Sequence, residues 1–240
     1  MPTKSPMSRV LNQFLEAHPG RDLDRDGLRL HYIDEGEGDP IVMLHGNPTW
    51  SFFFRRLIDG LRGSYRIVVP DHMGCGLSEK PEDQRYQYTL ESRVDDLEFL
   101  LDQLGIDRNI TLVLHDWGGM IGTTYAARFP DRIARMVVMN TAGFHLPASK
   151  VFPWPLWLGR NTALGGWMIR RLNAFCIGTA VIGCTKRPMD RDVRHAYIAP
   201  YDSWSHRIAI HRFVQDIPLR QGDRAYDVVS WVESRLPMLA

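Results

Sequence analysis

The chain has 240 residues, of which 44% are hydrophobic and 24% are charged, and its formal net charge is +1. This length can form one sizeable core, or one domain that carries an insertion. The near-neutral charge argues against nucleic acid or an anionic membrane surface as the primary partner, and 7 Trp, 8 Tyr and 10 Phe are too many for a chain that stays unfolded.

The amino-terminal segment has no long apolar run and no small-residue cleavage site, so we expect no secretory signal. No stretch approaches the roughly 20 apolar residues that a membrane span requires. Cys75, Cys176 and Cys184 are an odd number of cysteines without metal-ligand spacing, which indicates buried, reduced thiols. We therefore expect a cytoplasmic protein without a metal site, a cofactor or a nucleic-acid partner.

In the first predicted strand, Leu28, Leu30 and Tyr32 alternate with polar residues. A period of two is typical of a half-exposed strand, which we place at the edge of a sheet. Short apolar runs come later in the chain, and they have the length and flanks of strands that are buried on both faces of a parallel sheet. These runs cover residues 41–44, 67–69, 110–114 and 136–139.

Helical patterns separate these runs. The clearest begins after Thr89, a candidate N-cap, and ends at Gly105. Its apolar stripe consists of Leu90, Val94, Leu97, Leu101 and Leu104. The alternation predicts an α/β fold with right-handed crossovers and a mostly parallel, doubly wound sheet. Ligands of such sheets bind beyond the carboxyl ends of the strands, so the loops after the runs are the places to search.

The loop after the run at 110–114 carries the strongest chemical signal. It reads HDWGG, in which Asp116 is the acid, and it leads into a helical pattern over 120–128. A sharp strand-to-helix turn with small residues is a nucleophile elbow, and Asp116 stands where many hydrolases have serine. A carboxylate can attack a carbon that bears a leaving group, and activated water can then hydrolyse the ester. The alternative is that Asp116 only caps the helix.

The loop HGNP follows the run at 41–44. The backbone N–H of Asn47 in this loop can pair with that of Trp117 as an oxyanion hole. The Asn47 amide and the Trp117 indole are neutral N–H donors, which suit a halide or another small anion. The alternative is that Asn47 is a turn residue and that Trp117 fills the core. In the turn-rich loop over 70–81, we expect Asp71 to bond backbone groups.

The chain resembles the α/β-hydrolases of the haloalkane dehalogenase family in four motifs, which are HGNPTWSFFFRRLI, VPDHMGCGLSEKP, YTLESRVDDLEFLLDQLGI and HDWGGMIG. The resemblance implies that Asp116 is the nucleophile and that Asn47 and Trp117 are the halide ligands. Later segments, among them PWPLWLGR and RHAYIAPYDSWSHRIAIHRFVQDIPL, are most similar to the branch that contains the β-lactone decarboxylases of bacterial long-chain olefin biosynthesis. Those enzymes turn a dialkyl β-lactone into a cis-alkene and carbon dioxide. The resemblance thus implies this reaction first, haloalkane hydrolysis next, a hydrophobic small-molecule substrate, and assembly with other enzymes of olefin biosynthesis.

A change of composition near Gly143 predicts three parts: an α/β-hydrolase core over 1–143, a helical cap over 144–217, and a return to the core over 218–240. Seven aromatic residues of the cap are candidates for the lining of an apolar substrate cavity, and we expect one or two of them to face it while most pack the cap against the core. These residues are Trp154, Trp157, Trp167, Phe175, Tyr197, Tyr201 and Trp204. Epoxide hydrolases use the same nucleophile with two cap tyrosines as proton donors, so Tyr197 and Tyr201 keep that activity as a further alternative.

In the family, the catalytic acid follows the strand at 136–139 or the next strand, and the base histidine comes later. Asn140 occupies the first of these places, and none of the nine histidines fits the base, so the resemblance puts both groups past Ala240. We therefore expect the apolar run from Leu236 to be a strand cut short, with C-terminal strands and a helix missing. Such a chain would bind substrate and form an ester without efficient turnover. The alternative is a non-catalytic binding module or an incomplete gene product.

Overall fold

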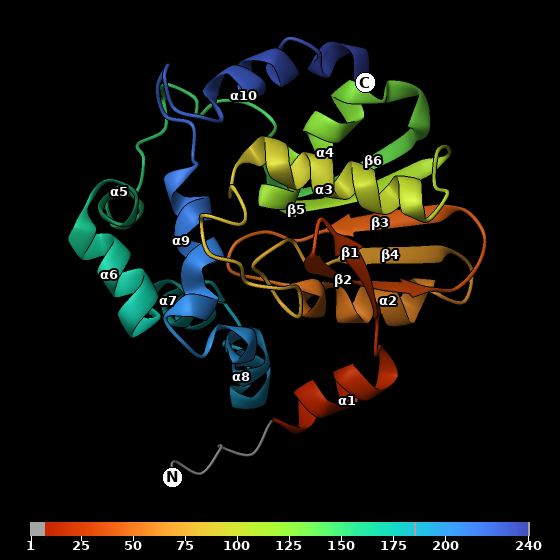
Figure 1. The fold of residues 1–240 in the computed structure, drawn as a ribbon, viewed down its shortest axis with the longest axis horizontal. Helices are drawn as coiled ribbons and strands as arrows, with labels where there is room; N and C mark the ends of the chain where they lie inside the picture. Colours follow the sequence, from red (N-terminus) through yellow and green to blue (C-terminus); the bar gives the residue numbers. More distant parts are fainter. Residues whose placement is uncertain (1–7, 185, 240) are drawn as a thin grey trace.

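The structure, a computed structural model, describes residues 8–184 and 186–239. Its centre is a six-stranded sheet with the strand order β1-β2-β4-β3-β5-β6 (Figure 1). The strands are β1 (Arg21–Arg25), β2 (Leu28–Glu35), β3 (Pro40–Leu44), β4 (Arg66–Pro70), β5 (Ile110–Asp116) and β6 (Ile133–Thr141). β3 is parallel to β4 and β5, and β5 is parallel to β6, whereas β2 is antiparallel to β1 and β4. The predicted α/β fold with a mostly parallel sheet is therefore confirmed.

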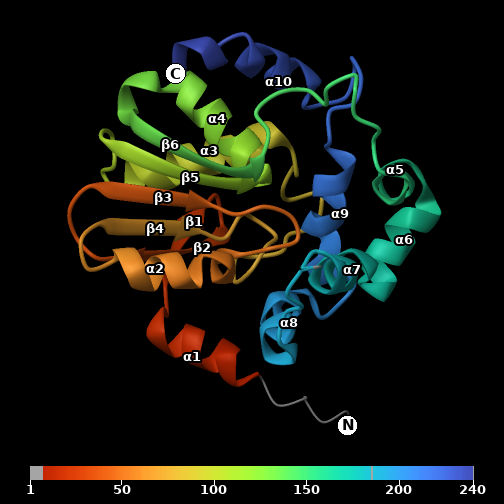
Figure 2. The ribbon, with the colours of Figure 1, turned by 180° about the vertical axis from the view of Figure 1, so that it is seen from behind.

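Helices cover both faces of the sheet (Figures 1 and 2). They are α1 (Arg9–Ala17), α2 (Arg55–Leu61), α3 (Leu90–Gln103), α4 (Trp117–Arg128), α5 (Trp154–Asn161), α6 (Ala163–Leu172), α7 (Ala174–Ile182), α8 (Arg191–Ile198), α9 (Ile208–Gln215) and α10 (Tyr226–Glu233). Along β3, Val42 and Leu44 pack into the core cluster shared with α3 and α4, while Ile41 and Met43 pack into the cluster shared with α1 and α2. Burial on both faces explains why this strand is a continuous apolar run.

The first edge of the sheet differs from the prediction. The strand predicted for the edge is β2, but β2 lies between β4 and a shorter strand, β1, that has no predicted counterpart. Leu23 is the one apolar residue of β1, so no alternation marks this strand. Asp26 and Gly27 join β1 to β2 with φ angles of 53° and 76°, as in a tight hairpin turn. This Asp-Gly pair is the sequence signal for the hairpin.

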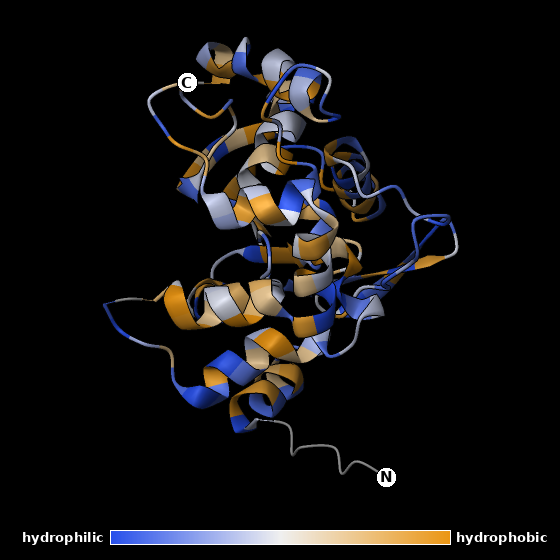
Figure 3. Cartoon of the chain, turned by 90° about the vertical axis from the view of Figure 1, so that its left-hand side faces the viewer, coloured by the Kyte–Doolittle hydropathy of each residue, from blue (hydrophilic) through white to orange (hydrophobic). Residues whose placement is uncertain are grey.

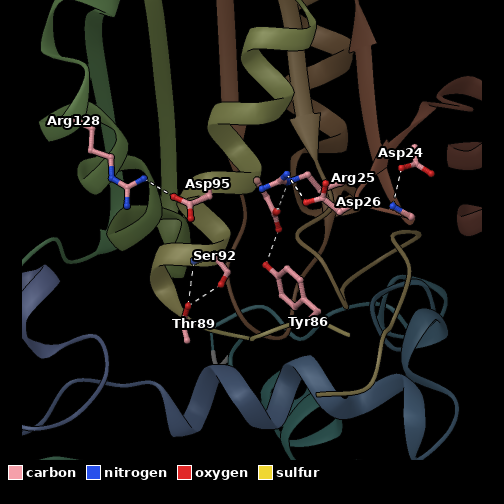
Figure 4. A network of polar contacts seen from close by, with 10 residues as sticks. Asp24, Arg25, Asp26, Tyr86, Thr89, Ser92, Asp95 and Arg128 are labelled. Carbon is pink, nitrogen blue, oxygen red and sulfur yellow. Dashed lines mark hydrogen bonds and ion pairs between the residues drawn. The ribbon is translucent and has the colours of Figure 1, made fainter. Parts of the chain in front are cut away.

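The start of α3 is the predicted N-cap. The hydroxyl oxygen of Thr89 accepts a hydrogen bond from the backbone N–H of Ser92 (3.2 Å), and the two hydroxyl oxygens are 2.9 Å apart (Figure 4). Further along the helix, Asp95 pairs with Arg128 of α4 (2.6 Å), as Figure 4 also shows. The cap and this ion pair fix α3 beside α4, the helix that follows Asp116.

Replacing Thr89 by alanine is expected to lower the free energy of unfolding by about 1 kcal/mol, because the first turn of α3 loses its side-chain acceptor. Thr89→Ser keeps the oxygen and should retain most of the stability. Urea denaturation of the three proteins measures the difference. Equal stability of the alanine variant and the wild type would contradict the capping role.

Residues 144–217 supply helices α5 to α9, which lie beyond the carboxyl ends of the parallel strands (Figure 2). The loop after β3 reaches these helices directly. The Trp50 indole donates a hydrogen bond to the carbonyl of Ala196 on α8 (3.1 Å), and the Asn47 amide donates to the carbonyl of Ile210 on α9 (3.0 Å).

The aromatic residues of this helical segment do not all turn inward. Four tryptophans are neither packed into the core nor part of the cavity that holds Asp116, and their exposed fractions are 75% at Trp154, 53% at Trp157, 47% at Trp167 and 42% at Trp204. α5, α6 and α9 pack together through other faces, where Gly159, Ile169 and Val214 meet. The tryptophans of α5 and α6 therefore point away from the sheet.

The apolar run near the end of the chain is not a strand. Leu236–Leu239 forms a 3-10 turn, and Ala240 lies outside the described residues. Pro237 has no N–H to give to a sheet ladder, and Leu239 packs against the core cluster beside α4. The last strand of the described sheet is β6, where Val137 and Val138 are 46% and 59% exposed.

Two further findings concern residues 8–184 and 186–239 only. No helix among them is long and apolar enough to cross a membrane, and no three of their His, Cys, Asp and Glu side chains form a group that could hold a metal ion. The three cysteines have free thiols. Cys75 and Cys176 are buried as predicted, but Cys184 is only half-buried because it follows the last turn of α7.

Candidate active site

Asp116 stands at the junction of β5 and α4. Its φ of 51° and ψ of −126° are rare for any residue other than glycine. Backbone strain of this kind is typical of functional sites. At a nucleophile elbow it belongs to the sharp strand-to-helix turn from which the reactive side chain projects. α4 begins at Trp117, three residues before the pattern at 120–128, because the residues of HDWGG that follow Asp116 already form its first turn.

Two glycines let the neighbouring loops approach the elbow. A Cβ atom on Gly46 would collide with the carboxylate of Asp116, and a Cβ atom on Gly118 would collide with the backbone carbonyl of Leu44. The loop after β3 can therefore pass directly over the Asp116 side chain. No other residue type fits these two positions without moving the backbone.

The carboxylate of Asp116 is held from the loop after β3. The backbone N–H of Asn47 donates a hydrogen bond to Asp116 Oδ1 (2.7 Å). The hydroxyl of Thr141, at the end of β6, donates to the backbone carbonyl of Asp116. The carboxylate also lies at the amino end of α4, where the helix dipole favours negative charge. One carboxylate oxygen is thus bound to a backbone donor, which leaves the other available for attack.

Asp116 and Trp117 share a cavity of about 180 Å³. Its other lining residues are Met120, Asn140, Thr141, Ala142 and Ile217. The Asn47 side chain does not line it: its amide nitrogen donates to the carbonyl of Ile210, and its buried amide oxygen has no partner among the described residues. The structure therefore brings the backbone of Asn47 to Asp116. One N–H group of the Asn47 amide is bound to α9, and the pairing of the second with the Trp117 indole at an anion stays a prediction.

A second cavity, of about 80 Å³, begins at Pro48, next to Asn47. It lies between the loop after β3 and the helices over 144–217, and it is lined by Pro48, Thr49, Phe53, Cys176, Thr179, Ala180, Met189 and Tyr197. Phe53 also stacks on His115, with ring centroids 4.2 Å apart. An apolar chain that entered this cavity would therefore lie near the residue that precedes Asp116.

A buried ion pair between Arg93 and Asp216 lies next to the ring of Trp117. Arg93 of α3 is 1% exposed and pairs with Asp216, the residue after α9 (3.3 Å). Its guanidinium lies 3.7 Å from the ring centroid of Phe213 and 5.7 Å from that of Trp117. Burial raises the pKa of Asp216 to about 6, although Arg93 acts in the opposite direction. Desolvation thus outweighs the attraction between the two charges.

Sequence reasoning missed Arg93 and Thr141 as parts of the site. Arg93 stands within the apolar stripe of α3, where a cation is out of place, and this was the available signal. Thr141 follows the run at 136–139, but nothing in its own sequence context identifies Asp116 as its partner. Both roles depend on contacts between residues far apart in the chain.

The histidines near Asp116 have other partners. His45 is fully buried; one ring nitrogen accepts from the backbone N–H of His72 (3.1 Å) and the other lies 3.0 Å from the carbonyl of Gly46. Burial lowers the pKa of His45, His72 and His115, so their neutral forms are favoured. In the part of the chain that the structure describes, no histidine side chain makes a hydrogen bond to Asp116.

Asp71 has the structural role that the sequence predicts. Its two carboxylate oxygens accept hydrogen bonds from the backbone N–H groups of Ser51 (2.7 Å) and Leu77 (2.8 Å), and the side chain is fully buried. It therefore joins two loops at the carboxyl end of the sheet.

The hydroxyls of Tyr197 and Tyr201, the candidate proton donors of an epoxide hydrolase, also have hydrogen-bond partners. The hydroxyl of Tyr201 donates to the carbonyl of Thr49 (3.0 Å), and the hydroxyl of Tyr197 accepts from Arg55 (3.2 Å). Burial raises the pKa of both. Neither hydroxyl lines the cavity of Asp116, which argues against epoxide hydrolysis.

Residues 39–171 match the alpha/beta hydrolase fold family. The chain is 54% identical over 218 residues to a cis-3-alkyl-4-alkyloxetan-2-one decarboxylase of Shewanella oneidensis, an alignment that covers 91% of this chain and 69% of the relative. It is 33% identical over 217 residues to a haloalkane dehalogenase of Psychrobacter cryohalolentis, covering 88% and 68%. A solved structure of a mutant haloalkane dehalogenase, DatA of Agrobacterium tumefaciens, superposes with a TM-score of 0.81 at 28% identity, covering 94% of this chain and 77% of that one.

Proposed function

Since this chain belongs to the α/β-hydrolase family, we propose that it converts a cis-dialkyl β-lactone into a cis-alkene and carbon dioxide. The observation that carries this proposal is the similarity over 91% of the chain to a relative named as a decarboxylase of such lactones, at 54% identity against 33% for the dehalogenase. The substrate proposed is a small hydrophobic molecule. The cavity at Asp116 suits a polar ring, and the apolar cavity beside the loop after β3 suits an alkyl chain.

We propose Asp116 as the nucleophile. Its strained backbone and its position at the junction of β5 and α4 support this role. Attack by a carboxylate oxygen on the ring carbon that bears the lactone oxygen breaks that C–O bond, forms an ester with Asp116 and releases the substrate carboxylate. Loss of carbon dioxide from this carboxylate then supplies the electron pair of the alkene, and the bond to Asp116 breaks. The lactone yields one alkene and one carbon dioxide, and Asp116 is regenerated without water.

In this route, the backbone N–H of Asn47 would stabilise the oxygen of Asp116 that does not attack, since it already donates to Oδ1. Trp117 and the Asn47 amide are proposed to bind the substrate carboxylate, the amide through the N–H group that does not donate to the carbonyl of Ile210. The acid and the base histidine that the resemblance implies past Ala240 stay a prediction. The direct elimination itself needs no water-activating histidine.

Haloalkane hydrolysis is the second candidate. It would use the same Asp116 ester, but regeneration then requires a water molecule activated by a base. The similarity to haloalkane dehalogenases supports this candidate, but the sequence identity to them is lower than the identity to the decarboxylase. Assembly with other enzymes of olefin biosynthesis, a cytoplasmic location, and the role of residues 144–217 as a cap also remain proposals.

The test offers the purified chain a cis-dialkyl β-lactone and 1,2-dibromoethane in water enriched in ¹⁸O. We expect alkene and carbon dioxide from the lactone, little bromide, and no ¹⁸O in the peptide that contains Asp116. Bromide without alkene would overturn the proposed reaction in favour of dehalogenation, and ¹⁸O in Asp116 would overturn elimination without water. Lactone binding without any product would favour a non-catalytic binding module or an incomplete gene product.

A further inference from the structure

The segment from the start of β6 to just before α8 is basic, although the whole chain is nearly neutral. Residues 133–189 contain no Asp or Glu. They contain seven cations, which are Arg135, Lys150, Arg160, Arg170, Arg171, Lys186 and Arg187. Because the whole chain sums to +1, the remainder carries a formal charge of −6. Arg160 alone among the seven forms an ion pair with a described residue, Asp223 (2.6 Å). Arg170 is half-buried, donates to the carbonyl of Trp204 (3.3 Å) and lies over its ring. The other five cations are exposed and therefore accessible to an external anion.

The same segment has an exposed apolar surface. α5, α6 and α7 follow one another, and they lie together on the side of the molecule away from the sheet (Figure 1). Large apolar side chains stand out from these helices with the following exposed fractions: Trp154 75%, Trp157 53%, Leu164 60%, Trp167 47%, Leu172 51%, Ile177 45%, Val181 52% and Ile182 70%. Figure 3, which looks onto the side where α5 and α6 lie in Figure 1, shows hydrophobic and hydrophilic residues mixed along the helices there. We call this surface the α5–α7 face.

The apolar residues and the cations occupy common stretches of the α5–α7 face. On α6, Leu164, Trp167 and Arg171 are spaced by three and four residues and so share one side of the helix. On α7, Ile177 and Val181 share a side in the same way. Lys186 and Arg187, both exposed, follow the end of α7. Cations thus border the apolar residues, whereas no carboxylate within 133–189 does.

We propose that the α5–α7 face docks on the surface of an anionic phospholipid bilayer. Interfacial surfaces of this kind combine exposed Trp, Leu and Ile with Lys and Arg, because the apolar side chains enter the boundary of the acyl chains while the cations meet the lipid phosphates. Tryptophan is enriched at the level of the headgroups. The absence of acids from 133–189 matters most, since a carboxylate there would be repelled by the lipids.

Docking of this face would hold the molecule on the bilayer without crossing it. It would also bring the site next to the phase in which a dialkyl β-lactone dissolves. The advantage for substrate access rests on the proposed function, but the binding of the α5–α7 face to lipid does not. Failure of lactone turnover would therefore leave the lipid-binding experiment valid, and failure of lipid binding would leave the turnover experiment valid.

The experiment measures sedimentation of the full chain with vesicles of phosphatidylcholine alone, or with roughly one third phosphatidylglycerol. We expect binding to the anionic vesicles, little binding to the neutral ones, and a blue shift of tryptophan fluorescence on binding. The double variant Arg171→Glu, Arg187→Glu is expected to lower the partition coefficient by roughly tenfold or more. The double variant Trp154→Ser, Ile182→Ser should also bind more weakly, and unfold like the wild type because both side chains are exposed.

The matched control reverses two cations at the other end of the sheet, Arg62→Glu and Arg108→Glu. Their side chains are 42% and 87% exposed, and they precede β4 and β5. This control changes the net charge by the same amount and should keep most of the binding. Absent binding to anionic vesicles, equal binding to both kinds of vesicle, or an equal loss in the control would each overturn the proposal. Self-association of the chain in place of lipid binding would do the same and would assign the face to a second copy.

Discussion

Asp116→Ala is expected to abolish alkene formation, with a loss of roughly 10⁴-fold or more, because covalent catalysis has no substitute once its nucleophile is removed. The carboxylate is the group that forms the ester, and no other described acid lines its cavity. Two measurements check this: the rate of alkene release, and mass spectrometry of the peptide that contains residue 116 after incubation with the lactone. We expect both the product and the covalent adduct to disappear.

Asp71→Asn is the informative control for this experiment. Asp71 also follows a strand, but both of its oxygens accept backbone N–H bonds, so the amide would turn an NH₂ group toward one of the two donors. That mismatch should lower the free energy of unfolding by about 1–3 kcal/mol while the folded fraction keeps its activity. Full turnover by the Asp116 variant, or loss of the adduct in the Asp71 variant alone, would show that the nucleophile is misassigned.

The parts of the site that the sequence predicts are those that local chain geometry determines. The turn at Asp116 needs a strand, a tight bend and small residues within one short segment, so the motif HDWGG alone is enough to predict the turn. The N-cap at Thr89 is local in the same sense. β1 escaped prediction because its pairing with β2, and not its own pattern, makes it a strand.

Contacts between distant residues set the limit of prediction. The sequence predicts the Asn47 amide at an anion site, but it gives no sign that one of the amide N–H groups donates to a carbonyl of α9, 163 residues further along the chain. The outward turn of Trp154 and Trp157 likewise depends on which face of α5 packs against its neighbours. The net charge of +1 argues against an anionic surface as partner. This total, however, is the sum of a basic segment, residues 133–189, and an acidic remainder of the chain.

Arg93→Met is expected to lower the free energy of unfolding at pH 7 by about 3–5 kcal/mol, since it leaves a buried carboxylate at Asp216 without its cation. The variant also loses the guanidinium over the ring of Phe213. Urea denaturation measures the change. Adding Asp216→Asn in the same chain should restore much of the stability at pH 7, because the second substitution removes the unpaired charge.

The pH dependence of these variants follows from the direction of the Asp216 shift. Burial raises its pKa to about 6 in the folded protein, above its value in the unfolded chain. The folded state therefore binds this proton more tightly, and the associated stability is present at low pH and is lost as the pH rises through about 6. Without Arg93 the pKa should rise further, so the deficit of Arg93→Met should shrink when the pH falls from 7 to 5. The double variant should show no such recovery, because asparagine does not titrate. A deficit of the single variant that stays constant over this range would mean that lost packing, and not an unpaired carboxylate, explains the role of Arg93 beneath Trp117.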